Sequence, residues 1–142
     1  AQKAGAIAMS AGVNKGDWCP IVPSSMQSQA DENIYVLGDA SVAKSMPKSG
    51  FSANSQAKVA ANHIRGALTG SKVFPARYSN TCWSMVATDH GIKVGASYKS
   101  GTEKIEKTSG FVSKKGESSE IRKATFEESV GWYSGITSDM FS

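Results

Sequence analysis

Residues 33–41, Asn-Ile-Tyr-Val-Leu-Gly-Asp-Ala-Ser, constrain the fold of this chain more than any other stretch. The apolar and aromatic run 34–37 favours a β-strand, Gly38-Asp39 breaks it, and a helical pattern begins at about Gly50. A strand that ends in Gly-Asp before a helix places the Asp39 carboxylate at the carboxyl edge of a sheet, where open α/β sheets bind ligands. The segment therefore predicts that Asp39 accepts hydrogen bonds from ligand hydroxyls, while helix N–H groups meet a partly negative ligand atom.

The helix expected over residues 50–69 has the clearest periodicity in the chain. Ala53, Ala57 and Ala60 recur at helical spacing, and Ile64 continues the series. These small side chains predict a face that packs closely against a sheet, and Gly70 is a suitable stop.

The remaining pattern predicts an α+β fold. Residues 1–16 favour a short helix ending near Ala11-Gly12, and His63 and His90 are expected to be packed or solvated side chains, not ligands. His90 lies at the expected turn tip, where exposure is predicted. Beyond Pro75 we expect an antiparallel β-meander and a carboxyl-terminal helix whose aromatic end packs into a core. The expected ranges are 81–88, 91–99 and 104–112 for the strands and 118–134 for the helix.

Charge and length exclude several classes of protein. The 142 residues carry a net charge of only +4, with lysines scattered among acids, so a nucleic-acid face is not expected. No apolar run approaches the roughly 20 residues that span a bilayer. There is no Gly-x-Gly-x-x-Gly phosphate turn, and the chain opens mid-pattern without Met, which suggests the carboxyl portion of a longer polypeptide.

The two cysteines, Cys19 and Cys82, allow two interpretations. They are too few for a structural zinc site, so no metal is expected, and no Cys-x-x-Cys-His haem attachment occurs. Each could be a small buried apolar side chain, or at least one could have a redox role. The residues alone leave both interpretations open.

Several segments together resemble the flavoprotein subunit of flavocytochrome c sulfide dehydrogenase, a member of the disulfide-oxidoreductase-like FAD proteins. The likeness runs over nearly the whole chain. A Gly-Asp strand end is shared by many flavoproteins. The helix entrance at Met46–Gly50 and the run Asn80–Trp83 are more specific to this family. The resembling segments are 17–21, 34–41, 46–56, 78–84 and the end at Trp132-Tyr133.

The resemblance implies roles for named residues. Gly38-Asp39 would contact the flavin ribityl chain, and Lys48, Ser49 and Gly50 would face the pyrimidine end of the ring. Cys82 matches the family's redox cysteine, whose disulfide partner lies in an earlier part of the subunit, and Trp132 would lie near the flavin. The family oxidises sulfide through the disulfide and FAD in the periplasm, and passes electrons to haem on a c-type cytochrome subunit.

The resemblance also implies a domain organisation. Residues 1–16 would end a preceding nucleotide-binding-like domain, 17–72 would form the carboxyl-side part of a glutathione-reductase-like FAD-binding domain, and 73–142 would cover the flavin and form an interface. Without the phosphate turn and the partner cysteine, this chain alone is not expected to bind FAD tightly or complete a turnover. The alternatives are a fragment similar to sulfide:quinone oxidoreductase, and a non-catalytic module that docks an electron-transfer partner.

Overall fold

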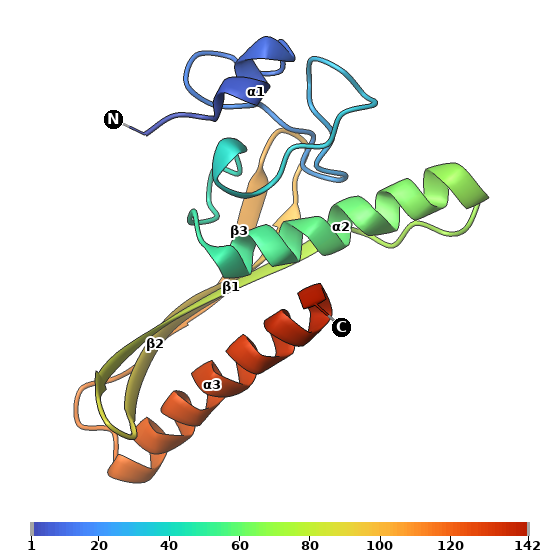
Figure 1. Ribbon diagram of the computed structural model, residues 1–142. Coiled ribbons are helices and arrows are strands. Elements are labelled where there is room, and N and C mark those ends of the chain that lie inside the picture. Colours follow the sequence, from blue (N-terminus) through green and yellow to red (C-terminus); the bar gives the residue numbers. More distant parts are fainter. Residues whose placement is uncertain (1, 142) are drawn as a thin grey trace. The chain divides into compact units, whose positions relative to one another are not determined.

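The computed structural model describes residues 2–141 and has an α+β fold, as expected (Figure 1). Three strands form one antiparallel sheet in the order β1-β2-β3, and a long helix follows them. The elements in chain order are α1 (Ala6–Ser10), the 3₁₀ turn η1 (Gly38–Ala40), α2 (Gly50–Thr69), β1 (Arg77–Ala87), β2 (His90–Ser100), β3 (Ile105–Val112) and α3 (Ser119–Phe141).

The helix α2 has the bounds that its sequence predicts. Ser49 caps its start, because the Ser49 hydroxyl accepts a 3.1 Å hydrogen bond from the backbone N–H of Ser52. Gly70 ends it in the left-handed conformation, with φ of 67°, and donates its N–H to the carbonyl of Gly66. Both ends are therefore fixed by local signals.

The predicted strand at residues 34–37 is wrong. Within residues 2–141, this segment forms only an isolated bridge, between Tyr35 and Gln27, and a 3₁₀ turn follows at Gly38. A strand needs a continuous ladder, but the segment it pairs with contains Pro23 and Met26, and Met26 has a φ of 67°. Asp39 therefore does not lie at the carboxyl edge of a sheet, contrary to the prediction.

The β-meander is confirmed: β1 starts four residues earlier than expected, β2 is one residue longer at each end, and β3 starts one residue later. The hairpin between β1 and β2 turns at Thr88-Asp89, where Asp89 has a positive φ of 55°. His90 starts β2 and is half-buried, so its predicted exposed position at the turn tip is wrong. The helix α3 continues to Phe141, well past residue 134.

The chain forms two compact units. Unit 1 consists of the segment up to Asn80 together with Ala96–Ser109. Its core combines residues from the loops, from α2 and from the sheet ends within this unit. The core residues are Ile21, Met26, Ala43, Met46, Val59, Ala60, Ala76, Tyr78, Ala96, Tyr98 and Ile105.

Unit 2 consists of Thr81–Gly95 and Gly110–Ser142, and in it α3 runs beside the end of the sheet where β1 and β2 join (Figure 1). The helix approaches β2 closely at Gly91, where a Cβ atom would lie 2.8 Å from the backbone nitrogen of Phe126. The predicted core packing of the aromatic end is wrong for Phe141, which is 80% exposed, and for Tyr133, which is 66% exposed.

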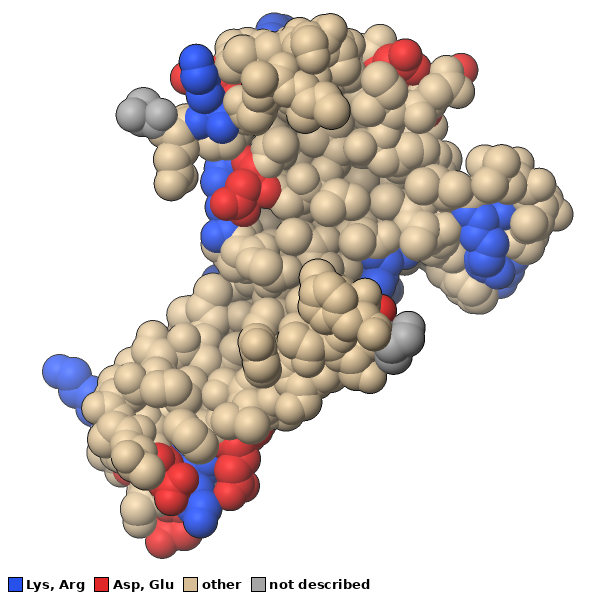
Figure 2. All heavy atoms as spheres, viewed as in Figure 1, with Lys and Arg blue, Asp and Glu red and all other residues tan. Residues whose placement is uncertain are grey.

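Surface charge and helix length bear on the possible partners. On the face that Figure 2 shows, Lys and Arg side chains lie in small separate groups and form no continuous basic surface. Within residues 2–141, no helix combines the length and apolarity that crossing a bilayer requires.

Candidate functional site

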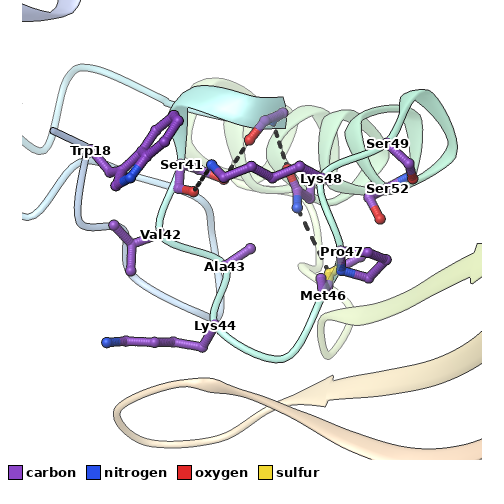
Figure 3. Close-up of a pocket in the computed structure, with 12 residues that line it drawn as sticks. Trp18, Ser41, Val42, Ala43, Lys44, Met46, Pro47, Lys48, Ser49 and Ser52 are labelled. Atoms are coloured by element: carbon purple, nitrogen blue, oxygen red, sulfur yellow. Dashed lines mark hydrogen bonds between the residues drawn. The ribbon is translucent and has the colours of Figure 1, made fainter. Parts of the chain in front are cut away.

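The first candidate site is a recess of about 210 Å³ in unit 1, beside the start of α2 (Figure 3). We call it the α2 recess. The loop before α2 forms most of its wall, and α2 contributes two polar side chains. The lining residues are Trp18, Gly38, Ser41, Val42, Ala43, Lys44, Met46, Pro47, Lys48, Ser49, Ser52 and Gln56.

Buried polar contacts hold the wall of the α2 recess in place. The N–H of Gly38 donates a 2.7 Å hydrogen bond to Oε1 of Gln56, whose residue is 1% exposed. Gly38 adopts a φ of 67°, a conformation that glycine reaches without the steric cost of a Cβ. On the helix side, the hydroxyls of Ser49 and Ser52 both donate to Oδ1 of Asn80, at 2.5 and 3.0 Å. The loop and helix are thus fixed by hydrogen bonds from three parts of unit 1.

Lys48 places a positive charge in the α2 recess. Its Nζ lies 3.5 Å from the centroid of the Trp18 ring and donates hydrogen bonds to the carbonyls of Asp39 and Ser41. Figure 3 shows the Lys48 side chain extending towards Ser41 and Trp18. A cation over an indole face is attracted by the ring, so Trp18 orients the ammonium group.

The five residues predicted to bind flavin come to neighbouring positions. Gly38, Lys48 and Ser49 line the α2 recess, whereas Asp39 and Gly50 are exposed and do not line it. Asp39 contributes its backbone carbonyl to Lys48. The assignment of all five to flavin stays a prediction.

Trp18 and Gln56 are among the lining residues that were not predicted from the sequence. Gln56 lies on the α2 face that packs inward, so a polar residue on that face was the available signal. Trp18 gave no comparable signal, since a tryptophan in a loop next to a proline is equally typical of a packed side chain.

The second candidate site is a recess of about 340 Å³ in unit 2, and it contains Cys82. We call it the Cys82 recess. Its lining contains four basic side chains and no carboxylate, and Ile92, Val94 and Val112 give it apolar walls. The complete lining is Cys82, Ser84, Ile92, Lys93, Val94, Val112, Ser113, Lys114, Lys115 and Arg122.

The two residues predicted to be catalytic lie on opposite faces of β1. Trp132 of α3 packs against Trp83, with ring centroids 5.6 Å apart. Cys82 and Trp83 are consecutive in a strand, so their side chains leave opposite faces. Cys82 lines the recess, whereas Trp83 meets the helix. The structure therefore assigns Cys82 and Trp132 to different surroundings within unit 2, and their catalytic roles stay predictions.

The two cysteines differ in burial. Cys19 is 0% exposed and packs with Ala4, Ala8 and Val13. Burial raises the pKa of the Cys19 thiol, while the positive charge of Lys48 opposes that shift. Cys82 is half-buried. In the part of the chain that the structure describes, neither cysteine is in a disulfide, and no three His, Cys, Asp or Glu side chains gather into a metal site.

A comparison with protein families gives a match over the meander and nearly all of the chain that follows it. Residues 74–141 match the family described as "Flavocytochrome c sulphide dehydrogenase, flavin-binding". The matched segment contains all three strands, α3, Cys82 and Trp132. The α2 recess lies before it in the sequence.

Proposed function

We propose that this chain, whose residues 74–141 match the family of the flavin-binding domain of flavocytochrome c sulphide dehydrogenase, forms the carboxyl-terminal part of a sulfide-oxidising flavoprotein. The family is one of FAD-binding oxidoreductases. In the proposal, electrons from sulfide pass to a c-type cytochrome subunit in the periplasm. The observation that best supports a sulfide site is the position of Cys82 in a recess with four basic side chains and no carboxylate.

The charge of the Cys82 recess suits hydrosulfide as a substrate. Cationic side chains raise the local concentration of a small anion, and the apolar walls lower the competition from water. In the proposed step, hydrosulfide attacks one sulfur of a disulfide between Cys82 and a cysteine outside this chain. A new S–S bond forms a persulfide, the old S–S bond breaks, and its electron pair leaves on the second sulfur as a thiolate.

The α2 recess suits one end of the flavin. Its volume of about 210 Å³ is below the ~300–1,000 Å³ of pockets that enclose a whole small ligand, so it fits part of FAD and not all of it. Lys48 and the start of α2 supply positive charge for a polar ring edge, and Ser49 supplies a hydroxyl. FAD, when bound, accepts the two electrons that sulfide loses. The phosphates would be held outside this chain, since the sequence has no Gly-rich phosphate turn.

A role for Trp132 beside the flavin is part of the same proposal. Its contact with Trp83 restricts the ring, and a restricted ring can form a fixed wall for a planar cofactor. Because Cys82 leaves the other face of β1, the proposal gives Trp132 a role in positioning the flavin and gives Cys82 the reaction with sulfide.

A second candidate function is that of an interface module for an electron-transfer partner. The exposed apolar side chains of α3 favour it, since Tyr133, Met140 and Phe141 are each more than 60% exposed. Exposed apolar patches mark interaction surfaces. Both functions can reside in one chain, because the Cys82 recess and these three residues involve different side chains.

The test compares Cys82→Ser with Cys19→Ser in the longer flavoprotein that the resemblance implies. We expect Cys82→Ser to abolish sulfide-dependent cytochrome reduction while the flavin absorption remains. Cys19→Ser is the control because Cys19 is fully buried and lines neither recess, and its turnover should stay near that of the parent. Unchanged turnover in Cys82→Ser would remove Cys82 from the mechanism.

A separate measurement tests the cofactor part of the proposal. FAD is mixed with the 142-residue chain and passed through gel filtration, and the flavin absorption of the protein peak is recorded. We expect little or no retained flavin, because the α2 recess holds only part of the cofactor. Stoichiometric retention would contradict the shared site.

A further inference from the structure

We propose that the Cys82 recess is a binding site for a small organic oxyanion, a compact apolar body that carries one phosphate or carboxylate group. This ligand class is distinct from sulfide, and the inference does not depend on flavin binding. The site combines a buried guanidinium group, two unpaired lysines and an apolar wall, all within unit 2.

Arg122 contributes a buried cation with unused hydrogen-bonding capacity. The residue is 9% exposed, and its Nη2 donates a 2.7 Å hydrogen bond to the carbonyl of Lys114. Its Nε lies 3.4 Å from Oε2 of Glu117, an ion pair that lacks hydrogen-bond geometry. Nη1 is buried and has no acceptor among the described residues. Leaving a buried donor unpaired is costly, so an acceptor oxygen at this position would be stabilising.

The planar guanidinium group indicates which anion is favoured. Its N–H groups form a rigid fork that matches the paired oxygens of phosphate or carboxylate, whereas a single spherical anion uses only one direction of that fork. Arg122 therefore favours an oxyanion over hydrosulfide.

Lys114 and Lys115 add charge that the protein itself does not neutralise. In the described part of the chain, the ammonium groups of these two residues form no ion pair, whereas Lys93 is paired with Glu128 through contacts of 2.7 and 2.5 Å. The backbone of Lys114 is held by Arg122 and by Glu117, so the base of its side chain is fixed at the recess. Two available cations and one guanidinium group make the recess attractive to an anion.

The size and walls of the recess argue for an organic ligand. A volume of about 340 Å³ lies at the lower end of the ~300–1,000 Å³ range of small-molecule pockets, and it is far larger than a lone tetrahedral anion needs. Ile92, Val94 and Val112 line it, and Val94 and Val112 are each at least half exposed. Covering these side chains with an apolar body removes apolar surface from water, which favours binding.

Occupancy of the recess would also control access to Cys82, since Cys82 belongs to the same lining. A bound oxyanion shields the thiol from reagents and excludes other anions. The alkylation rate of Cys82 therefore reports on binding.

The experiment measures alkylation of Cys82 by iodoacetamide in the 142-residue chain, followed by mass spectrometry. Phenyl phosphate is the probe, inorganic phosphate carries the charge alone, and phenol carries the apolar body alone. Cys19, which is 0% exposed, serves as an internal control that stays unmodified while the protein is folded. We expect saturating phenyl phosphate to slow alkylation of Cys82 at least about tenfold, and phenol to have little effect. Equal protection by inorganic phosphate would show an adventitious ion only, and would overturn the organic ligand. No protection by any probe would overturn the site.

Variants connect the protection to the named cations. The double variant Lys114→Met and Lys115→Met removes both exposed charges and retains the backbone contacts. It should weaken phenyl phosphate binding about fivefold, because two partly exposed charge pairs each contribute modestly. Lys123→Met is the matched control, since Lys123 follows Arg122 in α3, is exposed and does not line the recess. An equal loss in the control, or no loss in the double variant, would contradict the assignment. Arg122→Lys keeps the charge but removes the fork, so it should lower affinity for phenyl phosphate more than for chloride.

Discussion

Substituting alanine at two glycines of unit 2 should change stability in opposite directions. Gly91 lies where β2 approaches α3, and a Cβ atom there would lie 2.8 Å from the backbone nitrogen of Phe126 and 3.1 Å from its Cα atom. Backbone atoms cannot rotate away, so the strand and helix must separate. Overpacking of this kind costs ~1–3 kcal/mol, and we expect Gly91→Ala to lie in the upper half of that range.

Gly131→Ala provides the matched control. Gly131 lies inside α3, and a Cβ atom there would have no atom within 4 Å. Alanine in an open helical position stabilises a helix by about 1 kcal/mol relative to glycine. The same chemical change should therefore destabilise unit 2 at residue 91 and stabilise it at residue 131.

The assay is urea unfolding followed by hydrogen exchange of peptides from β2 and α3. With a typical denaturant slope of ~2 kcal/mol/M, Gly91→Ala should lower the midpoint by about 1 M and Gly131→Ala should raise it by about 0.5 M. Equal midpoints for Gly91→Ala and the parent would show that the close approach of β2 and α3 is not maintained in solution. A lower midpoint for Gly131→Ala would show that residue 131 is not in a helix.

Three further predictions concern unit 1. Gln56→Met should destabilise the protein by ~1–3 kcal/mol in urea unfolding, because the half-buried N–H of Gly38 loses its acceptor; an unchanged midpoint would contradict that bond. Ser49→Ala should cost about 1 kcal/mol in the same assay, since α2 loses its cap, and a cost near zero would show that the cap is dispensable. Burial raises the pKa of Tyr78 above its ordinary value of 10.0, so the unfolded chain loses this proton first as pH rises. Tyr78 should therefore leave the free energy of unfolding unchanged below about pH 10 and lower it above that pH. Tyr78→Phe should make this alkaline decrease shallower. The variant also loses the 2.6 Å hydrogen bond from the Tyr78 hydroxyl to the carbonyl of Pro23. An equal alkaline slope in both proteins would refute the assignment.

The helix α2 could be predicted from sequence because its determinants are local. Ser49 and Gly70 lie next to the ends that they fix, and the small residues between them repeat with the period of the helix. The meander was predictable for a similar reason, since its strands are consecutive and joined by short turns.

The segment before Gly38 could not be assigned in this way. Its apolar residues suit a strand, but strand formation depends on a partner elsewhere in the chain. Here the neighbouring segment offers one bridge to Tyr35, and the Tyr35 hydroxyl lies 2.8 Å from Nδ1 of His63 on α2. The contact with the helix replaces the ladder that the sequence pattern favours.

The candidate sites could also be predicted only in part, because some of their residues come together only in the folded chain. The resemblance implied site roles for Lys48 and Ser49 at the helix start, but it gave none to Trp18, which reaches the α2 recess from a distant loop. For the Cys82 recess, Arg122 lies 40 positions beyond the cysteine, and only the fold brings the two into one lining. Resemblance identified Cys82 but gave no information on the cations around it.

The positions of the tryptophans give each unit its own optical signal. Trp18 is the tryptophan of unit 1, and Trp83 and Trp132 form a ring pair in unit 2. An ammonium group above an indole quenches and shifts the indole emission, so Trp18 fluorescence reports on whether Lys48 stays over the ring. Two indole rings whose centroids lie 5.6 Å apart couple their transitions, so Trp83 and Trp132 give a paired circular dichroism band. The loss of order in either unit can thus be timed separately in one unlabelled sample.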